Sequence, residues 1–87
     1  MSSEPKGDQM TENEVIEVDA RGLSCPMPLL KTRKALATAS PGQSVVVLAT
    51  DRGAENDFLA YNERTDHRLE SLEWQDDVLR VVFIRAE

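Results

Sequence analysis

Short apolar runs separated by polar and turn-forming residues divide the chain into six predicted elements. Runs rich in β-branched residues predict four strands, and apolar residues at helical spacing predict two helices. The strands are expected near residues 15–18, 44–49, 69–74 and 78–85, and the helices over residues 26–39 and from Gly53 or Ala54 to Asn62. The order βαβαββ predicts an α/β two-layer sandwich (α+β), in which a four-stranded mixed sheet carries both helices on one face.

Three apolar segments carry further expectations about packing. The continuous run Ser44–Ala49 is typical of a central strand that is covered on both faces, or nearly so. The alternation is broken between Leu69 and Leu72, which indicates a bulge or a late strand start. Trp74 and Phe83 are expected in the core.

Charge is distributed unevenly along the chain. The net charge is −6, and the N-terminal residues 1–12 are polar without periodicity, so we expect them to form a flexible tail. Residues 18–40 are the one positive stretch, with four basic residues against Asp19. The four are Arg21, Lys31, Arg33 and Lys34. This stretch either favours a thiolate and steers an acidic partner, or is simply a solvated helix face.

Size and composition exclude several classes of protein. Eighty-seven residues suffice for one domain, and a single cysteine cannot form an intramolecular disulfide, which fits a reducing compartment. No apolar run approaches the roughly 18 residues of a membrane span. We therefore expect a cytoplasmic protein without membrane contact, and a monomer, because the surface is polar and the chain small. Overall acidity argues against direct nucleic-acid binding.

The only cysteine lies in residues 22–28, Gly-Leu-Ser-Cys-Pro-Met-Pro. Proline is favoured in the first turn of a helix, so Pro26 and Pro28 mark a helix start and place Cys25 at the N-cap. There the helix dipole would favour the thiolate, and Met27 would be the only one of the first three helical residues with an N–H for the sulfur. The prolines would stiffen this cap and expose the sulfur. The alternative is that Cys25 is a small buried hydrophobe.

Other polar residues allow two interpretations each. Asp51 and Asp57 are either paired carboxylates for acid–base work or, as we expect, a helix cap and a local hydrogen-bond acceptor. His67 is expected to be structural at a strand edge, with a proton relay as the alternative. One cysteine and one histidine cannot build a four-ligand zinc site, and the chain has no glycine-rich phosphate loop, so neither metal nor cofactor is expected.

Residues 19–29, Asp-Ala-Arg-Gly-Leu-Ser-Cys-Pro-Met-Pro-Leu, resemble the signature of the TusA/SirA family of small bacterial sulfur-carrier proteins. That signature is a Gly-Leu pair, one residue, then Cys-Pro-x-Pro. The resemblance extends over residues 14–86: Asp51 ends a strand, Asp57 follows with Phe58 behind it, and His67 precedes a strand. It implies a sulfur-carrier domain over residues 13–87, with a fold similar to the C-terminal domain of translation initiation factor three.

The resemblance also implies a function. Cys25 would accept sulfur as a persulfide from a cysteine desulfurase or other sulfurtransferase and relay it to an acceptor protein. The sulfur would be transient cargo, and the protein a sulfurtransferase-type carrier without independent turnover. The receiving pathway would be tRNA thiolation, molybdenum-cofactor maturation or sulfur oxidation. The expected partner surface comprises Arg21, Lys31, Lys34, Asp51 and Asp57, and Met27 would either contact a partner or pack against Leu30.

Two other functions fit the same residues. A non-catalytic regulatory module could use the basic helix to bind a partner protein, and it would not need the thiol. In a thiol redox sensor, an oxidant would oxidise Cys25 or drive it to form a disulfide with another protein. Replacing Cys25 by serine separates the first of these from a sulfur carrier.

Overall fold

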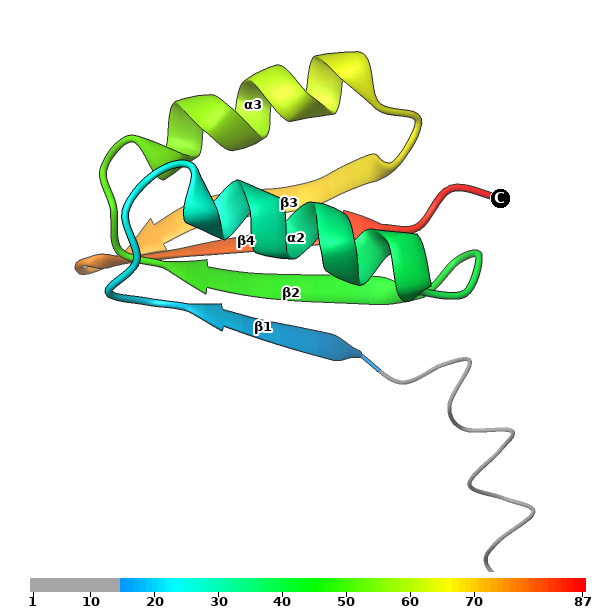
Figure 1. Ribbon diagram of the computed structural model, residues 1–87, viewed down its shortest axis with the longest axis horizontal. Helices are drawn as coiled ribbons and strands as arrows, with labels where there is room; N and C mark the ends of the chain where they lie inside the picture. The colour runs from blue at the N-terminus through cyan, green and yellow to red at the C-terminus, as the bar shows by residue number, and fades with distance from the viewer. Residues whose placement is uncertain (1–14) are drawn as a thin grey trace, which may run out of the picture.

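The computed structural model describes residues 15–87, and the predicted tail over residues 1–12 lies outside them. The elements follow the predicted order βαβαββ (Figure 1). They are β1 (Ile16–Ala20), α2 (Met27–Thr38), β2 (Ser44–Ala49), α3 (Ala54–Arg64), β3 (Arg68–Gln75) and β4 (Val78–Ile84). No helix within the described residues is long and apolar enough to cross a membrane.

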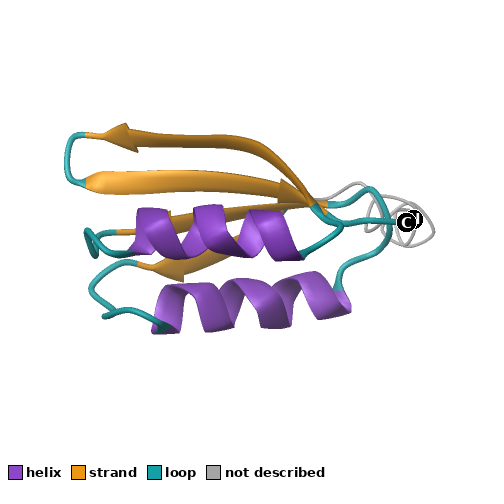
Figure 2. Cartoon of the chain, turned by 90° about the horizontal axis from the view of Figure 1, so that it is seen from above, coloured by secondary structure: helices purple, strands orange, loops and turns teal. Residues whose placement is uncertain are grey.

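The strands form one mixed sheet in the order β1-β2-β4-β3. β1 and β2 are parallel, and β4 is antiparallel to both β2 and β3. Helices α2 and α3 lie side by side on one face of this sheet (Figures 1 and 2). The predicted fold class, a two-layer sandwich with both helices on one face, is confirmed.

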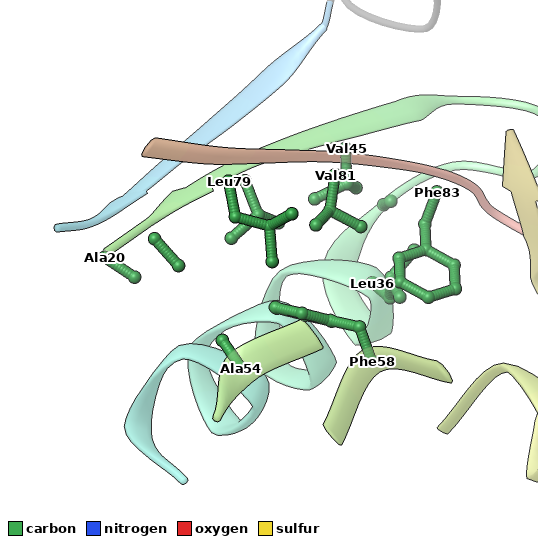
Figure 3. Packing of buried hydrophobic residues seen from close by; sticks show 11 residues of the cluster. Ala20, Leu36, Val45, Ala54, Phe58, Leu79, Val81 and Phe83 are labelled. Atoms are coloured by element: carbon green, nitrogen blue, oxygen red, sulfur yellow. The ribbon is translucent and has the colours of Figure 1, made fainter. Parts of the chain in front are cut away.

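The core lies between the sheet and the two helices (Figure 3). Alternate residues of the strands point to the helices, so β2 contributes Val45 and Val47 to the core, and both are fully buried. From the helices come Leu36 of α2 and Phe58 of α3. The Phe58 ring lies 6.2 Å from that of Phe83, as measured between ring centroids.

Two expectations about packing need correction, and one is confirmed. β2 is central, but its alternate residues Val46 and Leu48 are only half-buried because no helix among residues 15–87 covers the second face of the sheet. Trp74 lies half-buried at the edge of the core, where its Nε1 donates a hydrogen bond to Glu55 at 2.8 Å. The predicted irregularity in β3 is a register shift between Leu69 and Ser71.

Candidate functional site around Cys25

Cys25 lies in the loop between β1 and α2, at the edge of the sheet where two parallel strands end. Ala20 of β1 is paired with Ala49 of β2, so the loops that follow these strands leave the sheet next to each other. A hydrogen bond of 2.8 Å from the Gly22 N–H to Thr50 Oγ1 joins the two loops. The sheet topology therefore brings residues after β2 to the side of the thiol.

The cysteine is exposed, as predicted, but it is not the helix cap. Pro26 occupies the N-cap position, and α2 begins at Met27. The Met27 N–H donates to the Ser24 carbonyl at 2.8 Å instead of to the sulfur. The peptide bond between Cys25 and Pro26 is cis. The prediction of an N-cap thiol was wrong by one residue, because a tight turn over residues 24–27 precedes the helix.

Pro28 has a different environment from Pro26. It is buried against the core side of α2, and its carbonyl accepts a hydrogen bond of 2.8 Å from the hydroxyl of buried Thr32. The neighbouring apolar residues Met27 and Leu30 are each 44% exposed. The first turn of α2, which follows the thiol in sequence, therefore exposes apolar side chains.

Two carboxylates reach Cys25 from the segment after β2. The Cys25 N–H donates to Asp51 Oδ2, and the other oxygen of Asp51 accepts the Gly53 N–H at 3.1 Å. The thiol itself donates a hydrogen bond to Asp57 Oδ2 in the first turn of α3. Asp51 was expected to cap α3, but the N-cap is Gly53 and the helix has no side-chain cap; Asp51 instead accepts the N–H groups of Gly53 and Cys25 and so joins the cysteine loop to the start of α3. Asp57 was expected to make a local hydrogen bond, but it contacts the sulfur of a residue 32 positions away in sequence.

These contacts reverse the expected electrostatics of the thiol. The hydrogen bond to Asp57 is the largest cause, followed by partial desolvation and the negative charges of Asp57 and Asp51; together they raise the pKa of Cys25 to about 11. The backbone hydrogen bonds from Cys25 and Gly53 lower the pKa of Asp51. The expectation that the thiol deprotonates easily was wrong, since its nearest charged neighbours are acidic.

Arg21, Lys31 and Lys34, the basic residues of the expected partner surface, are not among the charged groups that act on the thiol. Arg21 forms an ion pair with Asp19 at 2.8 Å, which lowers the pKa of Asp19 to about 2. Lys31 and Lys34 line a shallow hollow beside β1, together with residues 17–19. These three basic residues are exposed, as a partner surface requires, but the hydrogen bonds around Cys25 come from Asp51 and Asp57.

A groove of about 420 Å³ between α2 and α3 was not foreseen. Asp57 is one of its lining residues, with Arg33 and Arg64 among the others. The spacing of Asp57, Tyr61 and Arg64 at i, i+4 and i+7 places them on one face of α3, and this regularity was readable in the sequence. The groove gives the carboxylate that contacts the thiol a side open to solvent.

His67 immediately precedes β3, and its role is structural, as expected. Its Nδ1 accepts a hydrogen bond of 2.9 Å from the Ala86 N–H, which holds the C-terminal segment. The connection from α3 to β3 is at the opposite end of the sheet from the loop between β1 and α2 (Figure 1). Within residues 15–87 there is no group of three or more His, Cys, Asp or Glu side chains suited to hold a metal ion.

Fold and site together define a small α/β domain that presents one thiol at the ends of two parallel strands. The sequence model of the family described as sulfurtransferase TusA matches residues 9–85. The chain therefore belongs to the TusA family.

Proteins similar to this chain are described as sulfur carriers or as SirA-like. A putative sulfur carrier protein of Neisseria meningitidis serogroup A is 45% identical over 65 residues, covering 75% of this chain and 88% of that protein. The sulfur carrier protein TusA of Allochromatium vinosum is 45% identical over 53 residues, covering 61% and 70%. The crystal structure of a SirA-like protein from Desulfitobacterium hafniense superimposes with a TM-score of 0.70 at 30% identity, covering 83% of this chain and 99% of that one.

Proposed function

We propose that this protein is a cytoplasmic sulfur carrier that receives sulfur on Cys25 as a persulfide and passes it to an acceptor protein. The donor is a cysteine desulfurase or another sulfurtransferase. The acceptor belongs to a pathway that consumes activated sulfur, of which tRNA thiolation, molybdenum-cofactor maturation and sulfur oxidation are the candidates. The protein meets both partners by transient contacts and acts as a monomer.

The observation that carries this proposal is an exposed, single cysteine in a defined loop of a TusA-family domain. Its exposure lets another protein reach the sulfur, and the exposed apolar side chains of Met27 and Leu30 in the first turn of α2 offer contact area. With only one cysteine in the chain, Cys25 has no resolving thiol in the same molecule. Sulfur that arrives on it must leave to another protein.

The proposed transfer conserves atoms and electrons. The Cys25 thiol loses its proton, and the thiolate attacks the terminal sulfur of the donor's persulfide. A new sulfur–sulfur bond forms on Cys25 while the bond within the donor persulfide breaks. The donor cysteine leaves as a thiolate and takes up a proton. The carrier thiol is thereby oxidised to a persulfide while the donor persulfide is reduced to a thiol, so the pair needs no external oxidant. The acceptor's thiol repeats the same exchange on the loaded carrier.

The carboxylates around the thiol weigh against the redox-sensor alternative. Oxidation by peroxide follows thiolate character, and the contacts with Asp57 and Asp51 raise the pKa of Cys25 to about 11. A thiol that stays protonated at neutral pH reacts slowly with peroxide. A purely regulatory module, the other alternative, would keep its function in Cys25→Ser, whereas a sulfur carrier would lose it.

Intact mass spectrometry tests the proposal directly. The protein is incubated with a cysteine desulfurase and cysteine, and a gain of one sulfur atom that a reductant reverses is expected. The Cys25→Ser variant is the matched control and should gain nothing. If the wild-type protein gains no sulfur from several desulfurases and a rhodanese, the carrier function is rejected. A second stage adds an acceptor thiol and follows loss of the same mass.

A further inference from the structure

Asp57 is placed to control the proton of Cys25. Its Oδ2 accepts the hydrogen bond of the thiol, while Asp51 fixes the backbone of the same residue. Gly53 packs close by, since a Cβ there would lie 3.9 Å from that of Cys25. The thiol is therefore held against the first turn of α3 by contacts to both its backbone and its side chain.

The arrangement conflicts with the chemistry that a carrier needs. The thiolate is the nucleophile in sulfur exchange, yet a carboxylate that accepts the S–H hydrogen bond favours the protonated form. The charged groups that act on the thiol are Asp57 and Asp51, and both oppose its ionisation. We therefore expect the contact between the Asp57 carboxylate and the thiol to change when the Cys25 sulfur attacks.

The surroundings of Asp57 show what that change requires. Among residues 15–87, the ion pair with a nitrogen–oxygen distance within 4.0 Å is that of Arg21 with Asp19. The Asp57 carboxylate therefore has no cationic nitrogen of these residues at that distance. Asp57 also lines the groove between α2 and α3, which is open to solvent. Arg33 and Arg64 line the same groove, but neither guanidinium forms an ion pair with Asp57 within 4.0 Å. The carboxylate is therefore still open to pairing with a positively charged group of another molecule that reaches it from the groove.

We propose that Asp57 is a positioning residue that keeps the Cys25 thiol protonated in the free carrier, and that a cationic group of the sulfur donor releases the thiol by pairing with the Asp57 carboxylate. The inference rests on the proposed sulfur-carrier function for the identity of the donor, but the state of the thiol is a property of this chain alone. In the free protein the sulfur is shielded from adventitious reaction. In the complex the donor's cation pairs with the Asp57 carboxylate, which then no longer holds the S–H hydrogen bond. The thiol proton leaves to solvent, and the thiolate attacks the donor's persulfide.

The first experiment titrates the thiol in the Asp57→Asn variant. The pH dependence of iodoacetamide alkylation is followed by mass spectrometry, and the thiol pKa is expected to fall by about one unit or more. Below the pKa, alkylation should accelerate by about threefold for each unit, because the gain in thiolate outweighs its lower nucleophilicity. Asp57→Ala should behave likewise, whereas Asp57→Glu, which keeps the charge, should stay closer to the wild-type protein.

The matched control is Asp66→Asn. Asp66 belongs to the connection between α3 and β3, which lies at the opposite end of the sheet from the loop of Cys25 (Figure 1), so this variant removes the same charge away from the site. It should titrate like the wild-type protein. Equal thiol pKa values in Asp57→Asn, Asp57→Ala and the wild-type protein overturn the proposal, and so does an equal shift in Asp66→Asn. Circular dichroism on each variant confirms that the titration is measured on folded protein.

The second experiment tests release by a cation. Cystamine, a dicationic disulfide, is compared with neutral hydroxyethyl disulfide; in each reaction the Cys25 thiolate displaces one half of the reagent as a thiol. The wild-type protein should favour cystamine by several-fold, and this preference should fall in Asp57→Asn but persist in Asp66→Asn. A preference that is unchanged by Asp57→Asn overturns the role of the cation.

Both readouts are independent of sulfur loading. If the titration and the disulfide preference follow the expectation but no donor loads Cys25, the proposed function fails and the control of the thiol stands. If a donor loads Cys25 but the thiol pKa is the same with and without the carboxylate at position 57, the proposed function stands and the control of the thiol by Asp57 is rejected.

Discussion

The N–H of Cys25 donates a hydrogen bond of 2.5 Å to Asp51 Oδ2, and this bond joins the loop after β1 to the loop after β2. The same carboxylate accepts the Gly53 N–H through its other oxygen. Asp51 therefore ties the thiol-bearing loop to the start of α3. The position of Cys25 depends on a residue 26 positions further along the chain.

Replacing Asp51 by alanine is expected to free the cysteine loop. The Cys25 amide should exchange with solvent faster by roughly tenfold or more, because its hydrogen bond to a charged acceptor is lost. Asp51→Asn, which keeps one acceptor oxygen, should lie between alanine and the wild-type protein. Hydrogen exchange followed by NMR provides the measurement, with Asp66→Ala as the control. Unchanged exchange at Cys25 in Asp51→Ala would show that the loop is held by other contacts.

The overall architecture was predictable because it follows from local patterns. β-branched runs and helical spacing gave the order of six elements, and the short connections left few topologies for two helices and four strands. The broken alternation of β3 also appeared as the register shift at Leu69 and Ser71. Such features involve residues close in sequence, and they depend little on the rest of the fold.

The site was predictable only in part. The motif identified Cys25, and the family resemblance pointed to Asp51 and Asp57, but spacing alone could not show that Asp57 contacts the sulfur. That contact depends on how α3 packs after the strand order is set, and it reverses the expected effect on the thiol pKa. The coverage of β2 was misjudged for a similar reason: apolar residues on both faces do not require a layer on both faces.

Two glycines near the site are expected to respond oppositely to alanine. Gly22 has a φ of +81°, which L-residues avoid, so Gly22→Ala should lower the free energy of unfolding by about 1–2 kcal/mol. Gly53 has φ −76° and ψ −10°, and a Cβ there would meet Asp51 at an ordinary 3.8 Å. Gly53→Ala should therefore raise stability by about 0.4–1 kcal/mol.

Urea denaturation of the two glycine variants, side by side with the wild-type protein, measures this difference. The slopes of the unfolding curves should be unchanged. Equal effects of the two substitutions would contradict the assignment of a left-handed backbone at Gly22.

The core prediction concerns two adjacent residues of α3. Phe58 is fully buried, whereas Leu59 is 40% exposed. Phe58→Ala should lower the free energy of unfolding by about 3–5 kcal/mol, because it leaves a cavity opposite Phe83. Leu59→Ala should change it by no more than about 0.5 kcal/mol. Thermal and urea unfolding of both variants provide the measurement. Similar losses of unfolding free energy in the two variants would contradict the orientation of α3.

The last prediction concerns pH and the single histidine. Partial burial is the main cause that lowers the pKa of His67 from its ordinary 6.5; the positive charge of Arg85 adds to this effect, and Asp66 opposes it. Nδ1 also accepts the Ala86 N–H, which a protonated ring cannot do. The folded protein therefore binds a proton on His67 less readily than the unfolded chain does.

The sign of the pH dependence follows from linkage. Because the folded pKa lies below the unfolded one, the contribution of His67 is complete above pH 6.5 and is lost as the pH falls from there through the folded value. Urea unfolding from about pH 7.5 down to about pH 5 should show falling stability in the wild-type protein and a flatter profile in His67→Gln. The chain has no other histidine, so the difference between the two profiles isolates this residue. Parallel profiles would mean that the neutral ring is not what holds the C-terminal segment.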